Sequence, residues 1–357
     1  MILHKLTLKN FRCFEQVALS LGSGSRLVIE GRNGSGKSSI IESLHYCCYL
    51  RSFRGGSTTA LMRSGGDKSF FIKLEGAHDD GEPFVIQVGY GEGKKLVKVN
   101  DKVVHTYKAV MDHYRVVSVA AHDLSLIQEG PDFRRTFLNN YCLLRDPACA
   151  DLLRAHKQIV TQRNELLVCG GGGSSNMEIW TQQLWEKAEE ITALREEALA
   201  ALSDKVNNLY AQMDSGTAPI SLRYVRRKRT AGQSFADFWS GYQNSIGQER
   251  HMKRSLFGAH LDDVAIELGG KSARTYASRG QQKLILVLLK LAQVQVLAEL
   301  QPQSGVLLLL DDVVTDFDRF ILDKILALLD TLPCGVVLTS PVAGMVTLPQ
   351  GAATISL

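Results

Sequence analysis

One short segment constrains this chain more than any other, because Gly31–Ser38 reads GRNGSGKS. It matches the pattern G-x-x-x-x-G-K-[S/T] and lies between the apolar stretch Arg26–Glu30 and a helical pattern that begins near Lys37. A strand, a glycine-rich loop and a helix in this order gather backbone N–H groups and a helix N-terminus around one point. Such a point binds phosphate groups, so the segment predicts a P-loop within an α/β fold.

Each residue type in this loop has a chemical role. The glycines let the backbone curl toward phosphate oxygens, the Lys37 ammonium reaches the β- and γ-phosphates, and the Ser38 hydroxyl completes a Mg²⁺ shell. No Asn-Lys-x-Asp guanine motif is found, so ATP and Mg²⁺ are the expected cofactors. The residues expected to bind the nucleotide in this segment are Gly31, Arg32, Asn33, Gly34, Ser35, Gly36, Lys37, Ser38 and Ser39.

Two acidic residues follow the apolar run GVLLLL far along the chain. Asp311 ends this expected strand, where it can hold Mg²⁺ through water, and Asp312 is placed to polarise an attacking water. An apolar strand capped by two solvated acids is the alternative, but a P-loop in the same chain favours the catalytic interpretation. Lys37, Asp311 and Asp312 are therefore the expected catalytic residues, and Ser38 and Asp311 the expected metal ligands.

A third motif, SRGQQK, opens a long apolar helical pattern upstream of the acidic strand. On its own, a serine at this point is a common helix cap. The order P-loop, Ser-x-Gly-Gln helix, acidic strand resembles the ABC class of ATPases, in which two heads sandwich two nucleotides. By that resemblance, Ser278, Gly280 and Gln281 contact the nucleotide bound to a partner copy.

The secondary structure expected from the sequence changes twice along the chain. Residues 1–130 read as short strands with Gly-rich breaks and one helix, residues 131–257 as long helical stretches, and residues 258–357 again as helices and strands. The strands of the last part are continuous apolar runs, typical of parallel strands covered on both faces. We therefore expect an ABC-type P-loop ATPase head, with mixed and parallel sheet, whose two parts flank an inserted helical arm domain.

Composition narrows the class of protein further. A net charge of +4 permits a polyanionic partner without demanding one. No stretch approaches the roughly 18 apolar residues of a membrane span, and no signal-peptide pattern opens the chain, so we expect a cytoplasmic protein without membrane contact. The 7 cysteines show no CxxC spacing and indicate reduced thiols rather than zinc ligands or disulfides.

Several segments in order resemble the RecF family, bacterial recombination mediators with an SMC-like ATPase head, over nearly the whole chain. The N-terminal LTLKNFRCFE is similar to that family's opening strand, and LRSFR follows the P-loop helix as in RecF proteins. The similar segments are Leu6–Glu15, the P-loop with Asn33, Leu50–Arg54, Leu61–Gly65, Glu129–Asn139, Gln162–Leu167, Gly258–Asp263, Ser278–Lys283 and Leu307–Asp318.

Three segments depart from the family pattern. Residues 121–123 read AHD where the family usually has Pro-Glu-Asp, and residues 258–263 read GAHLDD where it has Gly-Pro-His-Arg-Asp-Asp. Residues 315–318 read TDFD where it has Ser-Glu-Leu-Asp. The phosphate-binding core matches the family.

The resemblance implies an ATP-dependent DNA-binding protein that acts in recombinational repair of gapped DNA, in replication restart and in SOS induction. Its implied partners are single-stranded and gapped double-stranded DNA, a second copy in an ATP-dependent homodimer, and the RecO and RecR mediators. We expect a weak, DNA-stimulated ATPase, and its turnover is expected to be slow because Asp312 is one methylene shorter than the Glu of most ABC heads. The alternatives are an ABC-type ATPase subunit that does not act on DNA and an ATP-binding scaffold without hydrolysis.

Some residues keep two interpretations. Arg12 faces the nucleotide base, as SMC-like heads imply, or is a surface arginine. His260 senses nucleotide or is a buried, hydrogen-bonded structural histidine. The basic run Tyr224–Arg229 is a solvated face or tracks a DNA backbone. Arg134 and Arg135 are expected as ion-pair donors to acids of the arm.

Overall fold

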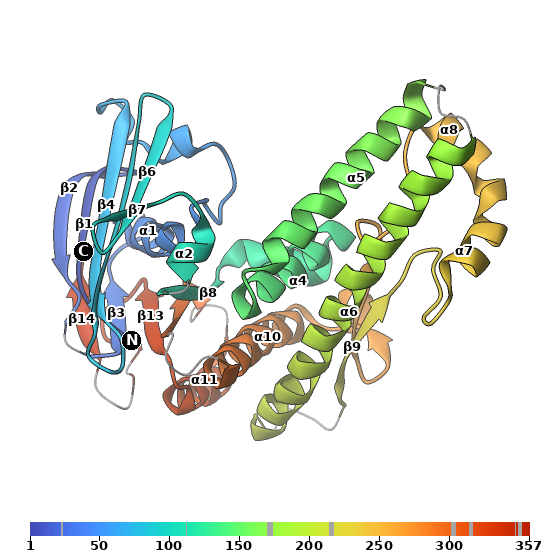
Figure 1. Ribbon diagram of the computed structural model, residues 1–357. Coiled ribbons are helices and arrows are strands. Elements are labelled where there is room, and N and C mark those ends of the chain that lie inside the picture. The colour runs from blue at the N-terminus through green and yellow to red at the C-terminus, as the bar shows by residue number, and fades with distance from the viewer. Residues whose placement is uncertain are drawn as a thin grey trace. The chain divides into compact units, whose positions relative to one another are not determined.

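Two compact units make up the structure, a computed structural model (Figure 1). We call them the head unit, which comprises residues 1–124, 205–217 and 278–357, and the arm unit, which comprises residues 125–204 and 218–277. The described residues are 1–22, 24–111, 113–169, 174–213, 218–300, 305–313, 317–346, 348 and 352–357.

A five-stranded parallel sheet of order β14-β3-β13-β12-β8 lies at the centre of the head unit. Its strands are β3 (Arg26–Glu30), β8 (Arg115–Val119), β12 (Val306–Leu310), β13 (Gly335–Ser340) and β14 (Ala353–Ser356). Every residue of β3, β8, β12 and β13 is buried, as continuous apolar runs predict for parallel strands. The carboxyl ends of parallel strands share one edge of the sheet, and ligand sites of α/β proteins lie there.

Helices cover this sheet. They are α1 (Lys37–Tyr49), α10 (Arg279–Leu300) and α11 (Arg319–Thr331), with the short segments η1 (Thr58–Leu61), α2 (Tyr107–Met111) and η2 (Ala121–Leu124). Helix α1 contacts strands of both head sheets and is buried over nearly its whole length. Helix α10 packs against β8 and β12, and its burial confirms the core helix expected for this apolar stretch.

The second sheet of the head unit has six antiparallel strands in the order β2-β1-β4-β5-β6-β7. They are β1 (Ile2–Phe11), β2 (Phe14–Ser20), β4 (Ser69–Ala77), β5 (Pro83–Gly91), β6 (Lys94–Val99) and β7 (Lys102–Val104). Burial alternates residue by residue along β4, as in a sheet with one face on the core and one toward water. The buried face includes Ile72, Leu74, Ile86 and Val88.

Long helices and a small sheet form the arm unit. The helices are α3 (Ser125–Gln128), α4 (Pro131–Arg145), α5 (Cys149–Cys169), α6 (Ser174–Gln212), α7 (Phe235–Tyr242), η3 (Gln243–Ser245), α8 (Ile246–Met252) and α9 (Ala273–Tyr276), with α6 ending in the head unit. The strands β9 (Ile220–Val225), β10 (Asp263–Leu268) and β11 (Lys271–Ser272) pair in the order β11-β10-β9. Of the glycine-rich turn expected between α5 and α6, residues 170–173 lie outside the described residues.

The unit boundaries differ from the three-part division expected from sequence. Residues 258–277, expected in the head, group with the arm unit because β10 pairs with β9 over its whole length. Residues 205–213, expected in the arm, group with the head unit, where Lys205 pairs with Glu299 and Lys324 donates to the Met213 carbonyl at 2.6 Å. The borders between the two units are thus set by strand pairing and helix packing, which the change from strand-like to helical sequence does not reveal.

The cysteines of the chain are free thiols, and Cys13 and Cys169 are the exposed ones. Burial raises the pKa of Cys142 to about 12, so this thiol stays protonated at neutral pH. Among the described residues, no helix combines the length and the apolar composition that a membrane crossing requires.

Candidate nucleotide site

The P-loop sits at the carboxyl end of β3, and two of its glycines have left-handed backbone conformations. Gly34 has φ 86° and Gly36 φ 104°, in the region that favours glycine. A Cβ atom at Gly36 would also lie 2.6 Å from the Phe14 ring. The loop can therefore follow this path only with glycine at Gly36, where α1 begins.

The start of α1 points unpaired donors at this loop. The N–H groups of Lys37 and Ser38 lie in its first turn, where a helix supplies no acceptor of its own. Among the described residues, no side chain caps this end of α1. The positive end of the helix dipole and these donors form an anion site, as the motif predicts.

The Lys37 ammonium is held above the loop by backbone carbonyls. Its Nζ donates to the Gly31 oxygen at 2.6 Å and to the Arg32 oxygen at 3.1 Å, and the side chain is buried. Carbonyl oxygens are weaker partners for an ammonium than phosphate oxygens. The ammonium can therefore exchange these bonds for phosphate contacts.

Asp311 and Asp312 follow β12, next to the P-loop. Asp311 is buried, and its carboxylate accepts from the Ser38 hydroxyl and, at 3.2 Å, from the Thr339 hydroxyl. Burial raises the pKa of Asp311, and the charge of Asp312 adds to the rise. The structure thus brings together the two residues that the sequence predicted as metal ligands.

Thr339, on the neighbouring strand β13, was not predicted from sequence. Its Oγ1 accepts from the Asp312 backbone N–H at 2.8 Å and lies 3.4 Å from the Asp312 carboxylate. Asp312 itself has φ 54°, an uncommon conformation for aspartate. One fully buried hydroxyl therefore orients both acids, and the sequence signal for it is only a polar residue near the end of an apolar strand.

Arg12 is tied to the P-loop helix. Its Nε and Nη2 donate to the two carboxylate oxygens of Glu42 at 2.8 and 2.7 Å, and Nη1 donates to the Ala60 oxygen at 2.8 Å. Glu42 is fully buried on α1 and also accepts from the Ser52 hydroxyl. These bonds make Arg12 more than a surface arginine, and its contact with a base stays a prediction.

Ser278 caps α10. Its Oγ accepts from the Gln281 N–H at 3.2 Å, and the Gln281 side chain accepts from the Ser278 N–H at 2.8 Å. Gly280 is exposed, and a Cβ atom there would meet nothing within 4 Å. Among the described residues, no hydrogen bond joins Ser278 or Gln281 to the P-loop of the same chain.

Two of the segments that depart from the RecF pattern have visible roles. The Asp123 carboxylate accepts from the Ala120 N–H at 2.9 Å, and Phe53 of the LRSFR segment stacks on His122 at 5.5 Å. Asp318 caps α11 by accepting from the Ile321 N–H at 2.9 Å. Thr315 and Asp316 lie outside the described residues.

The basic run Tyr224–Arg229 is neutralised inside the arm unit to an extent that the sequence did not reveal. Arg226 pairs with Glu189 at 2.8 Å and with Glu196 at 2.9 Å. Arg229 is buried and pairs with Asp262, which is fully buried. Both interpretations of the run were wrong for Arg226 and Arg229, because acids of α6 and of the β10 region neutralise them.

The other arginines of the arm form ion pairs too. Arg134 pairs with Asp263 at 2.7 Å and Arg135 with Asp132, which confirms the expected role of both. A pair that the sequence did not predict joins Arg163 to Glu249 at 2.6 Å, and both side chains are fully buried.

His260 is half-buried, and its Nδ1 has no hydrogen-bond partner among the described residues. Its ring lies 5.5 Å from that of His156, which is buried. Burial, followed by the charges of nearby arginines, lowers the pKa of His260 to about 4. It is thus a neutral histidine at physiological pH, but not one satisfied by hydrogen bonds at Nδ1.

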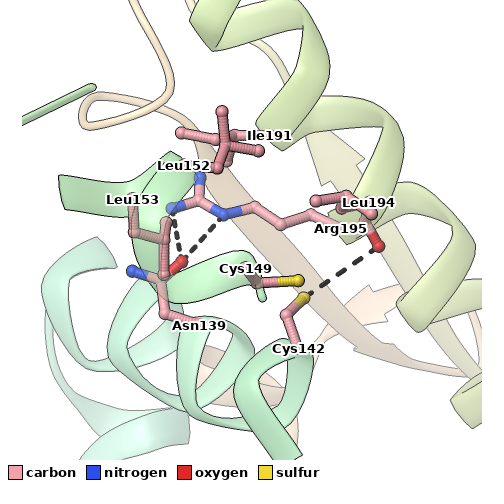
Figure 2. A pocket seen from close by; sticks show the side chains of 8 residues that line it. All are labelled: Asn139, Cys142, Cys149, Leu152, Leu153, Ile191, Leu194 and Arg195. Carbon is pink, nitrogen blue, oxygen red and sulfur yellow. Dashed lines mark hydrogen bonds between the residues drawn. The ribbon is translucent and has the colours of Figure 1, made fainter. Parts of the chain in front are cut away.

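A small cavity in the arm unit does not compete with the P-loop as a site. It measures about 10 Å³, enough for about one water molecule. Figure 2 shows Arg195 beside it, donating to Asn139 at 2.8 and 3.1 Å. The lining residues are Asn139, Cys142, Cys149, Leu152, Leu153, Ile191, Leu194 and Arg195.

Comparison with known proteins agrees with this geometry. A family profile described as "AAA domain" matches residues 5–212. A protein of Desulfitobacterium hafniense named "DNA replication and repair protein RecF" is 30% identical over 333 residues, covering 90% of this chain and 88% of its own. The protein of the same name from Moorella thermoacetica is 30% identical over 322 residues, covering 89% and 84%.

Solved structures show the same fold. A structure of the recombination mediator protein RecF with ATP has a TM-score of 0.85 at 23% identity, over 97% of this chain and 93% of that one. An Smc head domain of Pyrococcus furiosus has a TM-score of 0.53 at 17% identity, over 95% and 89%.

Fold and site together define a P-loop ATPase head of the ABC and SMC type, as expected from the order of the motifs. Within that class, the chain belongs to the RecF family. The resemblance found in its motifs is thereby confirmed.

Proposed function

We propose that this chain is an ATP-dependent DNA-binding protein that acts in recombinational repair of gapped DNA, replication restart and SOS induction. The observation that carries the proposal is the contact between Ser38 of the P-loop and Asp311 of β12. This contact brings the acid that is expected to hold Mg²⁺ to the phosphate-binding loop, which supports ATP binding. The names of the relatives, DNA replication and repair proteins, support the action on DNA.

Ser38 and Asp311 fit a Mg²⁺ ion bound with ATP. Mg²⁺ takes oxygen ligands and typically combines one or two protein groups with substrate phosphates and water. The hydroxyl and the carboxylate already face each other, so both oxygens can serve one ion. When bound, the ion neutralises charge on the β- and γ-phosphates.

The chain's own residues supply the remaining parts of ATP hydrolysis. Lys37 exchanges the Gly31 and Arg32 carbonyls for phosphate oxygens, and Asp312 orients the attacking water. Thr339 fixes the position of Asp312 through its backbone N–H. We propose that hydrolysis is slow, because an aspartate reaches less far than glutamate. We also propose that DNA stimulates it.

The proposed active form is a homodimer closed by ATP. Ser278 caps α10, Gly280 and Gln281 lie in its first turn, and Gly280 leaves open space beside its backbone. This arrangement supports contact with the γ-phosphate on a partner copy, since a helix N-terminus favours anions. The other proposed partners are single-stranded and gapped double-stranded DNA and, by family, RecO and RecR in the cytoplasm.

The test is binding of a fluorescently labelled gapped duplex, followed by anisotropy with and without ATP·Mg²⁺. We expect tighter binding with ATP in the unmodified protein and no ATP effect in Lys37→Ala. Lys108→Ala, an exposed lysine of the same unit, is the matched control and should behave as the unmodified protein. Equal binding with and without ATP would favour an ATPase subunit that does not act on DNA.

A further inference from the structure

The outward face of the antiparallel sheet carries a concentration of lysines. The register Thr7–Lys73–Gln87–Lys98 crosses β1, β4, β5 and β6 on this face. Burial alternates along these strands, so the residues of this row point away from the buried Ile72 and Ile86. The outward lysines, which we call the lysine face, are Lys5, Lys9, Lys73, Lys94 and Lys98.

Almost no negative charge balances the lysine face. Among the outward positions of the described strands, Glu75 is the one carboxylate, and it pairs with Lys73 at 2.7 Å. No ion pair within the described residues involves Lys5, Lys9, Lys94 or Lys98. Glu15, on the edge strand β2, pairs with Arg63 at 3.3 Å. Further carboxylates lie in the turns that join the strands, namely Asp79, Asp80, Glu82, Glu92 and Asp101.

The spacing of unpaired positive charges on a sheet determines which kind of anionic partner it can bind. Neighbouring strands lie about 4.8 Å apart, so lysines spread over several strands present a broad positive field. Duplex DNA carries about one phosphate per 3.4 Å on each strand, and such a field meets several phosphates at once. The sheet therefore matches a polyanion with regularly spaced charges.

The lysines, rather than the neutral positions between them, favour DNA as the partner of this face. Protein interfaces depend on buried aromatic or aliphatic anchors. Thr7, Gln87 and Gly89 supply no such anchor at the centre of the face, whereas the aliphatic residues Leu96 and Val103, 51% and 48% exposed, lie on its β6–β7 side. Phe71 is the one aromatic residue between the lysines and is half-buried, so the face offers little for stacking single-stranded bases.

We propose that the lysine face contacts the phosphate backbone of double-stranded DNA without reading its sequence. The inference rests on the proposed DNA-binding function and names the surface that performs it. It replaces the basic run Tyr224–Arg229 as the main cationic contact, because Arg226 and Arg229 of that run are neutralised within the arm unit.

The decisive variant replaces the four unpaired lysines, K5Q/K9Q/K94Q/K98Q, and leaves the Lys73–Glu75 pair intact. Affinity for a labelled gapped duplex is measured with ATP·Mg²⁺ over a series of NaCl concentrations. We expect the dissociation constant to rise about tenfold or more, and the salt slope to fall by about 2 to 4, because each phosphate contact contributes about 0.9.

A control with the same charge change, K108Q/K157Q/K253Q/K271Q, removes exposed lysines elsewhere and should change affinity less than about twofold, since scattered exposed charges contribute little. Binding of a fluorescent ATP analogue shows whether each variant is folded. If the fourfold variant does not fold, the half-variants K5Q/K9Q and K94Q/K98Q replace it, each with about half of the slope change.

The outcomes separate the two proposals. If the unmodified protein does not bind the duplex, the proposed function fails and the inference fails with it. If it binds, and the fourfold variant binds equally well or loses no more than the charge control, only the inference is overturned. The inference is likewise overturned if R227Q/K228Q loses the salt slope while the fourfold variant keeps it.

Discussion

The arm unit contains ion pairs in which both side chains are fully buried, whereas the head unit keeps several cations without an acidic partner among the residues that the structure describes. In the arm, arginines form ion pairs within the fold. Arg163 pairs with Glu249 and Arg229 pairs with Asp262, and both side chains of each pair are buried. In the head, Lys37 rests on backbone carbonyls and the lysine face has little compensation. Charge that is paired within the chain supports the fold, whereas charge left without a counter-ion is available to a ligand.

The role of paired charge in the arm is tested most directly at the buried Arg163–Glu249 ion pair. Glu249→Leu should lower the free energy of unfolding by about 3 to 5 kcal/mol, because it leaves the Arg163 guanidinium buried without a counter-charge. The double variant R163M/E249L should recover most of that loss. Urea unfolding followed by circular dichroism measures both. A loss below about 1 kcal/mol in Glu249→Leu would show that this pair does not support the arm.

The counterpart in the head is Lys37→Ala, which should leave the fold intact and weaken ATP binding by about 2 to 3 kcal/mol. That is the typical contribution of hydrogen bonds to a charged group. Calorimetry with ATP measures the affinity, and light scattering measures the ATP-dependent dimer, which should disappear. An undiminished dimer would contradict the phosphate role of Lys37.

Acid should lower the stability of the arm through the buried His156. Burial, the nearby His260 and surrounding arginines lower the pKa of His156 to about 3, below the ordinary value of 6.5. The unfolded chain therefore binds a proton between pH 6.5 and 3 that the folded chain refuses, and stability falls as pH falls through this window.

The measurement is the difference in unfolding free energy between His156→Phe and the unmodified protein at two pH values. From pH 7 to pH 5 it should shift in favour of the variant by about 2 kcal/mol, at about 1.4 kcal/mol per pH unit below 6.5. A difference that does not change with pH would show that His156 is protonated in the folded arm.

The smallest effect is expected at Thr339→Val in the head. Loss of the hydroxyl that holds Asp311 and Asp312 should reduce kcat for ATP about tenfold, or about 1.4 kcal/mol, with KM nearly unchanged. Thr339→Ser keeps the hydroxyl and is the matched control. If both variants hydrolyse ATP equally slowly, the methyl packing of Thr339 matters rather than its hydrogen bonds.

The sequence predicted those parts of the site whose residues are neighbours in the chain and have chemically suited side chains. Gly36 and Lys37 belong to one contiguous loop, and Asp311 ends an apolar strand, so both features can be read without a fold. Thr339 could not be found in this way, because its role depends on β13 lying beside β12.

The arm was predicted as helical but not as an ionic network. Arg226 and Glu189 are far apart in sequence, and nothing local in a basic run indicates that α6 supplies its counter-ions. The boundary near residue 258 was missed for the same reason, since β10 finds its partner β9 across intervening helices. Pairing between distant segments is a tertiary property that neither composition nor periodicity encodes.

The position of β3 in the parallel sheet has a consequence for biosynthesis. Both of its neighbours, β13 and β14, come from the C-terminal part of the chain. At about 5 to 20 residues per second, a ribosome needs roughly 15 to 60 s to make the roughly 300 residues between β3 and β13. For that time the nascent P-loop strand has no neighbour to pair with, and a chain interrupted before Gly335 would carry the phosphate-binding motif without the sheet that shapes it.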